Sequence, residues 1–88
     1  MKLIVPRSFA DYLNGKTEIM LEAENMQQLR QEIKEINPAL FRRIFDEEGK
    51  TRVFVKFFLG KHMVNDDNQL TEIKGGEVVT LVSAVAGG

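Results

Sequence analysis

A single amphipathic helical pattern is enclosed on both sides by segments of strand pattern. Asn25 can cap the start of this helix, and Asn37-Pro38 ends it, because proline disfavours helical backbone in the residue before it. A short second helix is predicted over residues 39–45. One main helix among several strands has to cover a sheet, so we expect an α+β domain. The apolar residues of the main helix follow at spacings of three, four and three and share one face: Met26, Leu29, Ile33 and Ile36.

Five segments are predicted to be strands, mostly from the alternation of apolar and polar residues: 2–6, 18–23, 52–59, 62–64 and 77–82. Lysine is rarely buried in a small core, so the face of segment 52–59 that carries Lys56 should be the outer one, together with Phe54 and Phe58. Parity also places Val78 and Val82 outward. This order predicts a β-grasp, or ubiquitin-like, roll, a mixed sheet of about five strands around one main helix. The opposite strand faces supply the predicted core: Leu3, Val5, Ile19, Leu21, Ala23, Val53, Val55, Phe57, Leu59, Val79 and Leu81.

The connections carry turn signals. Asn14-Gly15 predicts a hairpin turn between the first two strands, since both residues tolerate positive φ. Residues 8–13, between the first strand and this turn, are expected to form a wide loop. Gly60-Lys61 predicts a tight turn, and His62 beside it is expected to be a solvated turn residue.

The composition leaves few groups for catalysis. The chain of 88 residues has no cysteine and one histidine, His62, which excludes disulfides, thiolate catalysis and thiolate metal sites. Its two carboxylate runs, Asp46-Glu47-Glu48 and Asp66-Asp67, lie beside turn-forming residues, which favours solvated loops. No glycine-rich phosphate loop and no recognisable Ser/His/Asp arrangement occurs. We therefore expect no bound cofactor, no metal and no catalytic side chain.

Charge and hydropathy bear on partners and location. The net charge is −1 and the basic residues are spread along the sequence, so no basic stripe for nucleic acid is expected. No apolar run approaches the length that spans a membrane, and the N-terminus lacks the apolar region of a signal peptide. These features predict a cytoplasmic protein that contacts neither nucleic acid nor membrane.

The last six residues differ in character from the rest. Residues 83–88 are small and uncharged, and they are expected to form a flexible tail behind a β-grasp domain of residues 1–82. Terminal glycines can also be a frayed end without function. The ending Val85-Ala86-Gly87-Gly88, directly after a final strand opened by Gly76-Glu77-Val78, resembles the small sulfur-carrier proteins of the MoaD/ThiS family. Residues 78–88 are especially similar to the carrier that feeds a cysteine synthase. Family members often have proline where this chain has Ser83, and serine leaves the path of the tail less restricted.

The resemblance implies a protein substrate rather than an enzyme. An ATP-dependent adenylyltransferase of the ubiquitin-activating type would adenylate the carboxylate of Gly88, and a sulfur donor or sulfurtransferase would convert it to a thiocarboxylate. An acceptor synthase, such as the large subunit of molybdopterin synthase or a cysteine synthase, would receive the sulfur. ATP would be used by the activating partner, and no cofactor would be bound here. Four residues would thread the partner's active site: Ala84, Val85, Ala86 and Gly87.

The resemblance also implies an apolar sheet face near the tail that docks on partner enzymes. We expect this surface to include Phe54, Phe58, Met63, Val82 and Pro6. The acceptor stays open among molybdopterin, cysteine, thiamine and a sulfur-containing secondary metabolite, although the segment 38–50 is less like the shorter thiamine carriers. Two other functions stay open as well. The chain could be a ubiquitin-like modifier conjugated to lysines through Gly88, or a β-grasp binding module whose Gly-Gly end is accidental.

Overall fold

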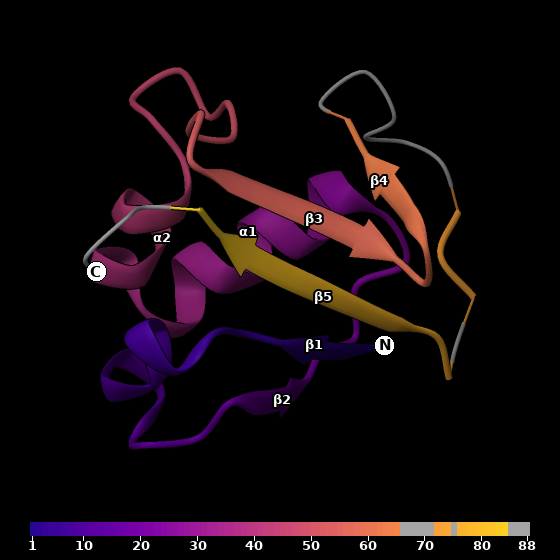
Figure 1. Ribbon diagram of the computed structural model, residues 1–88, viewed down its shortest axis with the longest axis horizontal. Helices are drawn as coiled ribbons and strands as arrows, with labels where there is room; N and C mark the ends of the chain where they lie inside the picture. Colours follow the sequence, from indigo (N-terminus) through magenta and orange to yellow (C-terminus); the bar gives the residue numbers. More distant parts are fainter. Residues whose placement is uncertain (66–71, 75, 85–88) are drawn as a thin grey trace.

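The strands form one mixed sheet in the order β2-β1-β5-β3-β4 (Figure 1). The computed structural model describes residues 1–65, 72–74 and 76–84. Within these residues β1 (Lys2–Ile4) and β5 (Val78–Ser83) run parallel in the middle of the sheet. The other three pair antiparallel with their neighbours: β2 (Glu18–Met20), β3 (Val55–Leu59) and β4 (His62–Val64). The predicted β-grasp order of strands and main helix is confirmed.

Two α-helices pack against one face of this sheet, and polar side chains fix their ends (Figure 1). They are α1 (Met26–Ile36) and α2 (Pro38–Ile44). The Asn25 side chain accepts a hydrogen bond from the Gln28 N–H at 2.8 Å, so the predicted cap of α1 is confirmed. Gln28 accepts in turn from the Glu24 N–H at 2.8 Å. The side chains of Asn25 and Gln28 thus each accept a backbone N–H at the start of α1.

Asn37 joins the two helices through three hydrogen bonds. Its Oδ1 accepts from the N–H groups of Ala39 at 3.0 Å and Leu40 at 3.1 Å, which caps α2. Its Nδ2 donates to the Tyr12 carbonyl oxygen at 2.9 Å. Asn37 thus holds α2 at a fixed position relative to the segment that precedes β2.

Replacing Asn37 by alanine should lower the free energy of unfolding by about 1–2 kcal/mol, because the cap of α2 is lost. The Tyr12 carbonyl oxygen also loses its donor, which adds to the cost. Denaturant unfolding followed by circular dichroism measures the difference. Gln27→Ala is the matched control, since Gln27 is an exposed amide side chain on α1. Equal stability of the two variants would contradict this role of Asn37.

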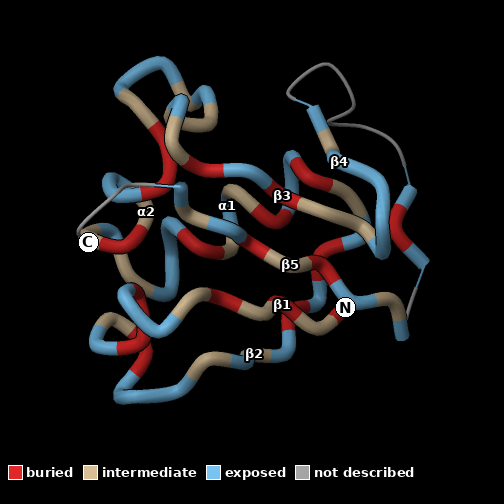
Figure 2. The backbone as a smooth tube through the Cα atoms, in the orientation of Figure 1, coloured by how far each residue is buried: buried red, intermediate tan, exposed pale blue. Residues whose placement is uncertain are grey.

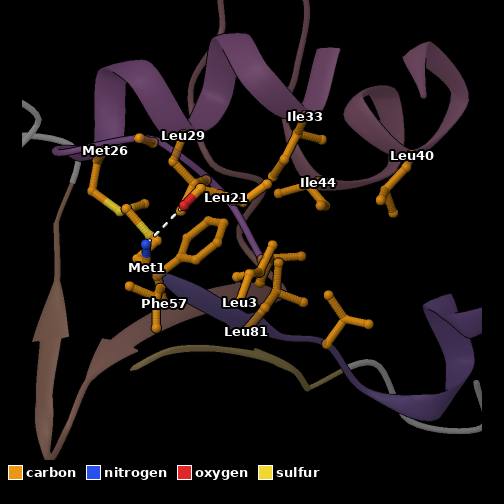
Figure 3. Packing of buried hydrophobic residues seen from close by; sticks show 14 of the residues in the cluster. Met1, Leu3, Leu21, Met26, Leu29, Ile33, Leu40, Ile44, Phe57 and Leu81 are labelled. Carbon is orange, nitrogen blue, oxygen red and sulfur yellow. Dashed lines mark hydrogen bonds between the residues drawn. The ribbon is translucent and has the colours of Figure 1, made fainter. Parts of the chain in front are cut away.

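The core lies between the sheet and the helices (Figures 2 and 3). Phe57 stacks on Phe45 with ring centroids 5.9 Å apart, which joins β3 to the end of α2. Ile73 is also buried, and its N–H donates to the Glu24 carbonyl oxygen at 2.6 Å. Most of the predicted core residues are buried, and Ile19 and Leu59 pack partly buried against them. The buried residues of the segments predicted as strands are Leu3, Val5, Leu21, Ala23, Val55, Phe57, Val79 and Leu81, of which Val5, Leu21 and Ala23 lie beyond the ends of β1 and β2.

Two predicted core residues are wrong. Val53 is 88% exposed, because β3 begins only at Val55 and residues 53–54 form a turn. The Val55 N–H closes this turn by donating to the Arg52 carbonyl oxygen at 3.0 Å. Ile36 is exposed at the last position of α1, where the helix no longer covers the sheet.

The expected wide loop over residues 8–13 is instead a 3₁₀ helix, η1 (Arg7–Leu13). It buries Phe9, Ala10 and Leu13. Asn14 has the expected positive φ, 58°, but it ends η1 rather than forming a two-residue hairpin turn. The Gly15 N–H donates to the Ala10 carbonyl oxygen at 2.8 Å. Asn14 therefore has the backbone conformation that the sequence predicted, but it ends a 3₁₀ helix instead of forming a tight turn between two strands.

The first carboxylate run forms a solvated turn, as predicted. The Asp46 side chain accepts from the N–H groups of Glu48 and Lys50, both at 2.9 Å. The second run lies outside the described residues, as does Leu70. His62 is exposed, but it lies in β4 and not in the turn. In the part of the chain that the structure describes, no group of three potential metal ligands occurs, and no helix combines the length and apolar character of a membrane span.

Candidate functional site

The site has two parts, the end of β5 and the sheet face beside it. β5 continues through Ser83, one residue beyond the predicted end of the strand, and Ser83 pairs with Val55. The Ala84 N–H then donates to the Phe54 carbonyl oxygen at 2.8 Å. The chain is thus held to β3 as far as Ala84, which is exposed. The other predicted tail residues lie outside the described residues: Val85, Ala86, Gly87 and Gly88.

The sheet face turned away from the helices carries three of the predicted docking residues. Phe58 pairs with Met63 on β4 and with Thr80 on β5, while Val82 pairs with Lys56. Side chains directly opposite in antiparallel strands lie about 4.5–5.5 Å apart, as Phe58 and Met63 do, and diagonal neighbours such as Phe58 and Val82 lie about 7–8 Å apart. Met63 is 48% exposed and Val82 is 42% exposed. The structure therefore places Phe58, Met63 and Val82 on one face, a position that strand parity predicted for Phe58 and Val82.

The same face continues along β5 to Val78, which parity placed outward, and across β1 and β2 to Ile4 and Met20, which sequence reasoning missed. Val78 is 38% exposed and Met20 is 70% exposed, and both pair with Lys2. Parity also places Ile4 on this face, opposite Thr80. The alternation in segments 2–6 and 18–23 also predicts these outward positions, but it was used only to predict the inward side chains. We define the outer apolar face as Ile4, Met20, Phe58, Met63, Val78 and Val82.

The other two predicted docking residues lie apart from the outer apolar face. Phe54 precedes β3, and its ring packs against the core, so its predicted position on the outer face is wrong. Its backbone still matters, because its carbonyl oxygen holds Ala84. Pro6 is partly buried and lies immediately before η1.

The polar side chains of the described residues lie in contact with solvent. No polar or charged side chain among them is buried. The hollows on the helix side are lined by solvated groups, for example Gln31, Lys34 and Glu48 in one and Glu22, Glu32 and Glu35 in another. The Glu32 carboxylate accepts from the N–H groups of Glu22 and Ala23 at 3.0–3.1 Å, which is a structural role.

Comparisons with known proteins support the fold. No protein-family model and no curated protein matches the sequence. A chain in the crystal structure of the Amycolatopsis orientalis BexX/CysO complex matches with a TM-score of 0.83 and 19% identity, over 99% of this chain and 98% of that one. Mycobacterium tuberculosis CysO, described as an antigen, matches with a TM-score of 0.82 and 18% identity, over 96% of this chain and 98% of that one. SAMP1 from Haloferax volcanii matches with a TM-score of 0.74 and 14% identity, over 100% of this chain and 98% of that one. The chain shares its whole fold with these small proteins.

Proposed function

We propose that this chain is a sulfur carrier that is activated and loaded at the carboxylate of Gly88. One observation carries the proposal. Gly87 and Gly88 stand three and four residues after Ala84, the first residue beyond the central strand, in a fold shared along nearly its full length with CysO. The lack of buried polar groups among the described residues is consistent with a protein substrate rather than a catalyst.

The chemistry needs a partner because a carboxylate is a poor electrophile. In the proposed activation, an oxygen of the Gly88 carboxylate attacks the α-phosphorus of ATP, and pyrophosphate leaves. A hydrosulfide ion then attacks the acyl carbon of the adenylate, AMP leaves, and loss of the proton gives the thiocarboxylate. Both steps take place in the active site of an adenylyltransferase that binds ATP, and a sulfurtransferase supplies the sulfur.

The geometry at the end of β5 suits delivery into a buried site. Residues 85–88 can extend about 13–14 Å beyond Ala84. Gly87 and Gly88 have no Cβ, so the end of the chain fits a narrow channel. Ordering these residues costs about 1–2 kcal/mol each, which contacts with a partner have to offset. We assign that role to the outer apolar face, which lies on the same strand as the exit of the tail.

The acceptor of the sulfur is a synthase in the formation of molybdopterin, cysteine or a related sulfur-containing metabolite. The similar chain of the BexX/CysO structure comes from a protein complex, which supports a protein partner of this kind. We place the reaction in the cytoplasm, where the activating enzyme has ATP.

The test incubates the full chain with the ubiquitin-activating-type adenylyltransferase of its own organism, ATP and sulfide. The intact mass should rise by one exchange of oxygen for sulfur, and fragmentation should place the change on the C-terminal peptide. The reaction without ATP is the control. Lysine conjugates joined through Gly88 would favour a protein modifier instead, and an unchanged mass would favour a simple binding module.

A further inference from the structure

Basic residues gather where β5 ends, although they are far apart in the sequence. Arg52 lies two residues before Phe54, whose carbonyl oxygen holds Ala84. The Arg52 Nε donates to the Arg42 carbonyl oxygen at 2.8 Å, so its guanidinium lies over the last turn of α2. Arg42 itself is exposed. Two cations thus lie beside the point at which the tail leaves the sheet.

Three further basic residues lie on elements next to this end of β5. The Arg43 guanidinium is 6.0 Å from the ring centroid of Phe9, which brings η1 next to α2, and Arg7 begins η1. Lys56 pairs with Val82 on the outer apolar face. Figure 1 shows the tip of β5 pointing toward the end of the molecule that α2 occupies. We call these residues the basic rim: Arg7, Arg42, Arg43, Arg52 and Lys56.

The basic rim is not neutralised by the described part of the chain. None of its five side chains lies within 4.0 Å of a described carboxylate. The acidic turn beyond α2 is engaged locally, since Asp46 accepts backbone N–H groups and Glu48 pairs with Lys50 at 3.8 Å. Asp11 on η1 is exposed. A larger acidic group lies elsewhere, where Glu22, Glu24, Glu32, Glu35 and Glu72 line two hollows that share Glu22 and Ala23. Although the net charge is only −1, the basic residues of the rim and the acidic residues around the two hollows lie in different parts of the surface.

We propose that the basic rim binds carboxylate side chains around the opening of the activating partner's site and steers the tail into it. This inference rests on the proposed function. A helix C-terminus favours cations, which accounts for Arg42 and Arg43 but not for Arg7 or Lys56. The position of Lys56 opposite Val82 makes the basic rim continuous with the outer apolar face, so one acidic protein surface can cover both. Complementary charge of this kind raises association rates by about 10–1,000-fold.

The test reverses charge at two rim residues that have no side-chain role in the described fold, in the double variant Arg7→Glu/Arg42→Glu. Lys61→Glu/Lys74→Glu is the matched control, because it changes the net charge equally at the other end of β3 and β5. ATP–pyrophosphate exchange is measured against carrier concentration with the same adenylyltransferase. The half-saturating concentration of the rim variant should rise about 10-fold or more at low salt, while the maximal rate and the control stay near wild type. The difference should shrink in about 1 M salt, where the screening length falls to about 3 Å.

The outcomes separate the two proposals. If the wild type supports exchange and both variants have the same half-saturating concentration, the basic-rim proposal is refuted but the sulfur-carrier proposal is not. If the wild type supports no exchange, both proposals are refuted. Melting curves establish folding, and Arg7→Gln/Arg42→Gln replaces the charge reversal if that variant unfolds, with an intermediate effect expected. A third outcome would overturn a protein partner and assign the basic rim to a membrane surface. The protein would bind phosphatidylcholine vesicles only when they contain phosphatidylserine and only when Arg42 is present, and the rim variant would exchange ATP and pyrophosphate as the wild type does.

Discussion

Deleting Gly88 should abolish formation of the thiocarboxylate and leave the free energy of unfolding unchanged. The deletion leaves a glycine carboxylate at residue 87, so the chemical group is preserved and only its position changes. One residue of extended chain is about 3.5 Å, and a displacement of even about 1 Å from the attacking geometry can cost about 100-fold in rate. Adding one alanine after Gly88 should have the same effect, because the acyl carbon then lies too far along the channel.

Both variants are measured by intact mass after the activation reaction and by thermal denaturation. The described core ends at Leu81 and the described hydrogen bonds of this segment end at Ala84, so the melting temperature should not move. Gln27→Ala serves as a surface control that keeps both activity and stability. Full loading of the shortened chain would refute Gly88 as the site, and loss of folding would assign the last residue a structural role.

Strand parity predicted the core wherever the strand was regular. Val55 and Phe57 in β3 and Val79 and Leu81 in β5 are buried as expected, because residues two apart share a face in a paired strand. The rule failed at Val53, where the chain forms a turn before the pairing with β5 begins. Alternation in a sequence does not state where hydrogen bonding to the neighbouring strand starts, so the boundary could not be predicted.

The short helix η1 escaped prediction for a related reason. Phe9, Ala10 and Leu13 are its buried residues, and a stripe this short cannot be distinguished from a loop that buries some of its residues. Asn14 gave the only clear local signal, a positive φ, which is equally compatible with a hairpin and with the end of a helix.

The candidate site was predicted only in part. Gly88 came from the resemblance of the last dozen residues to a known family, and no periodicity in the sequence identifies it. The basic rim could not be predicted at all, since Arg7, Arg42 and Lys56 lie in three different elements and tertiary contacts alone bring them to one end of β5. An even spread of charge along the sequence was therefore compatible with a cluster in space.

Serine substitutions at Phe57 and Phe58, adjacent in β3, should have opposite consequences. Phe57 is buried and stacked on Phe45, and truncation of a buried phenylalanine costs about 3–5 kcal/mol. The net stability of a small domain is about 5–10 kcal/mol, so Phe57→Ser should remove about a third of it or more and lower the melting temperature by about 12–40 °C. Phe58 lies on the outer apolar face and is only partly buried, so Phe58→Ser should lower the melting temperature less than Phe57→Ser does.

Substitutions on the outer apolar face should affect binding to the activating partner more than they affect stability. Phe58→Ser and Val82→Asp should each weaken binding to the activating partner by about 1–3 kcal/mol, which is about 5–150-fold in Kd, because both residues lie on the outer apolar face and Val82 is the residue before the end of β5. Titration calorimetry measures Kd, and melting curves on the same samples separate docking from stability. Lys61→Ala, in the exposed turn between β3 and β4, is the control and should bind as wild type does. If Phe58→Ser and Val82→Asp both bind with unchanged affinity, the outer apolar face is not the docking surface, and contacts of the tail and the basic rim must supply the binding energy.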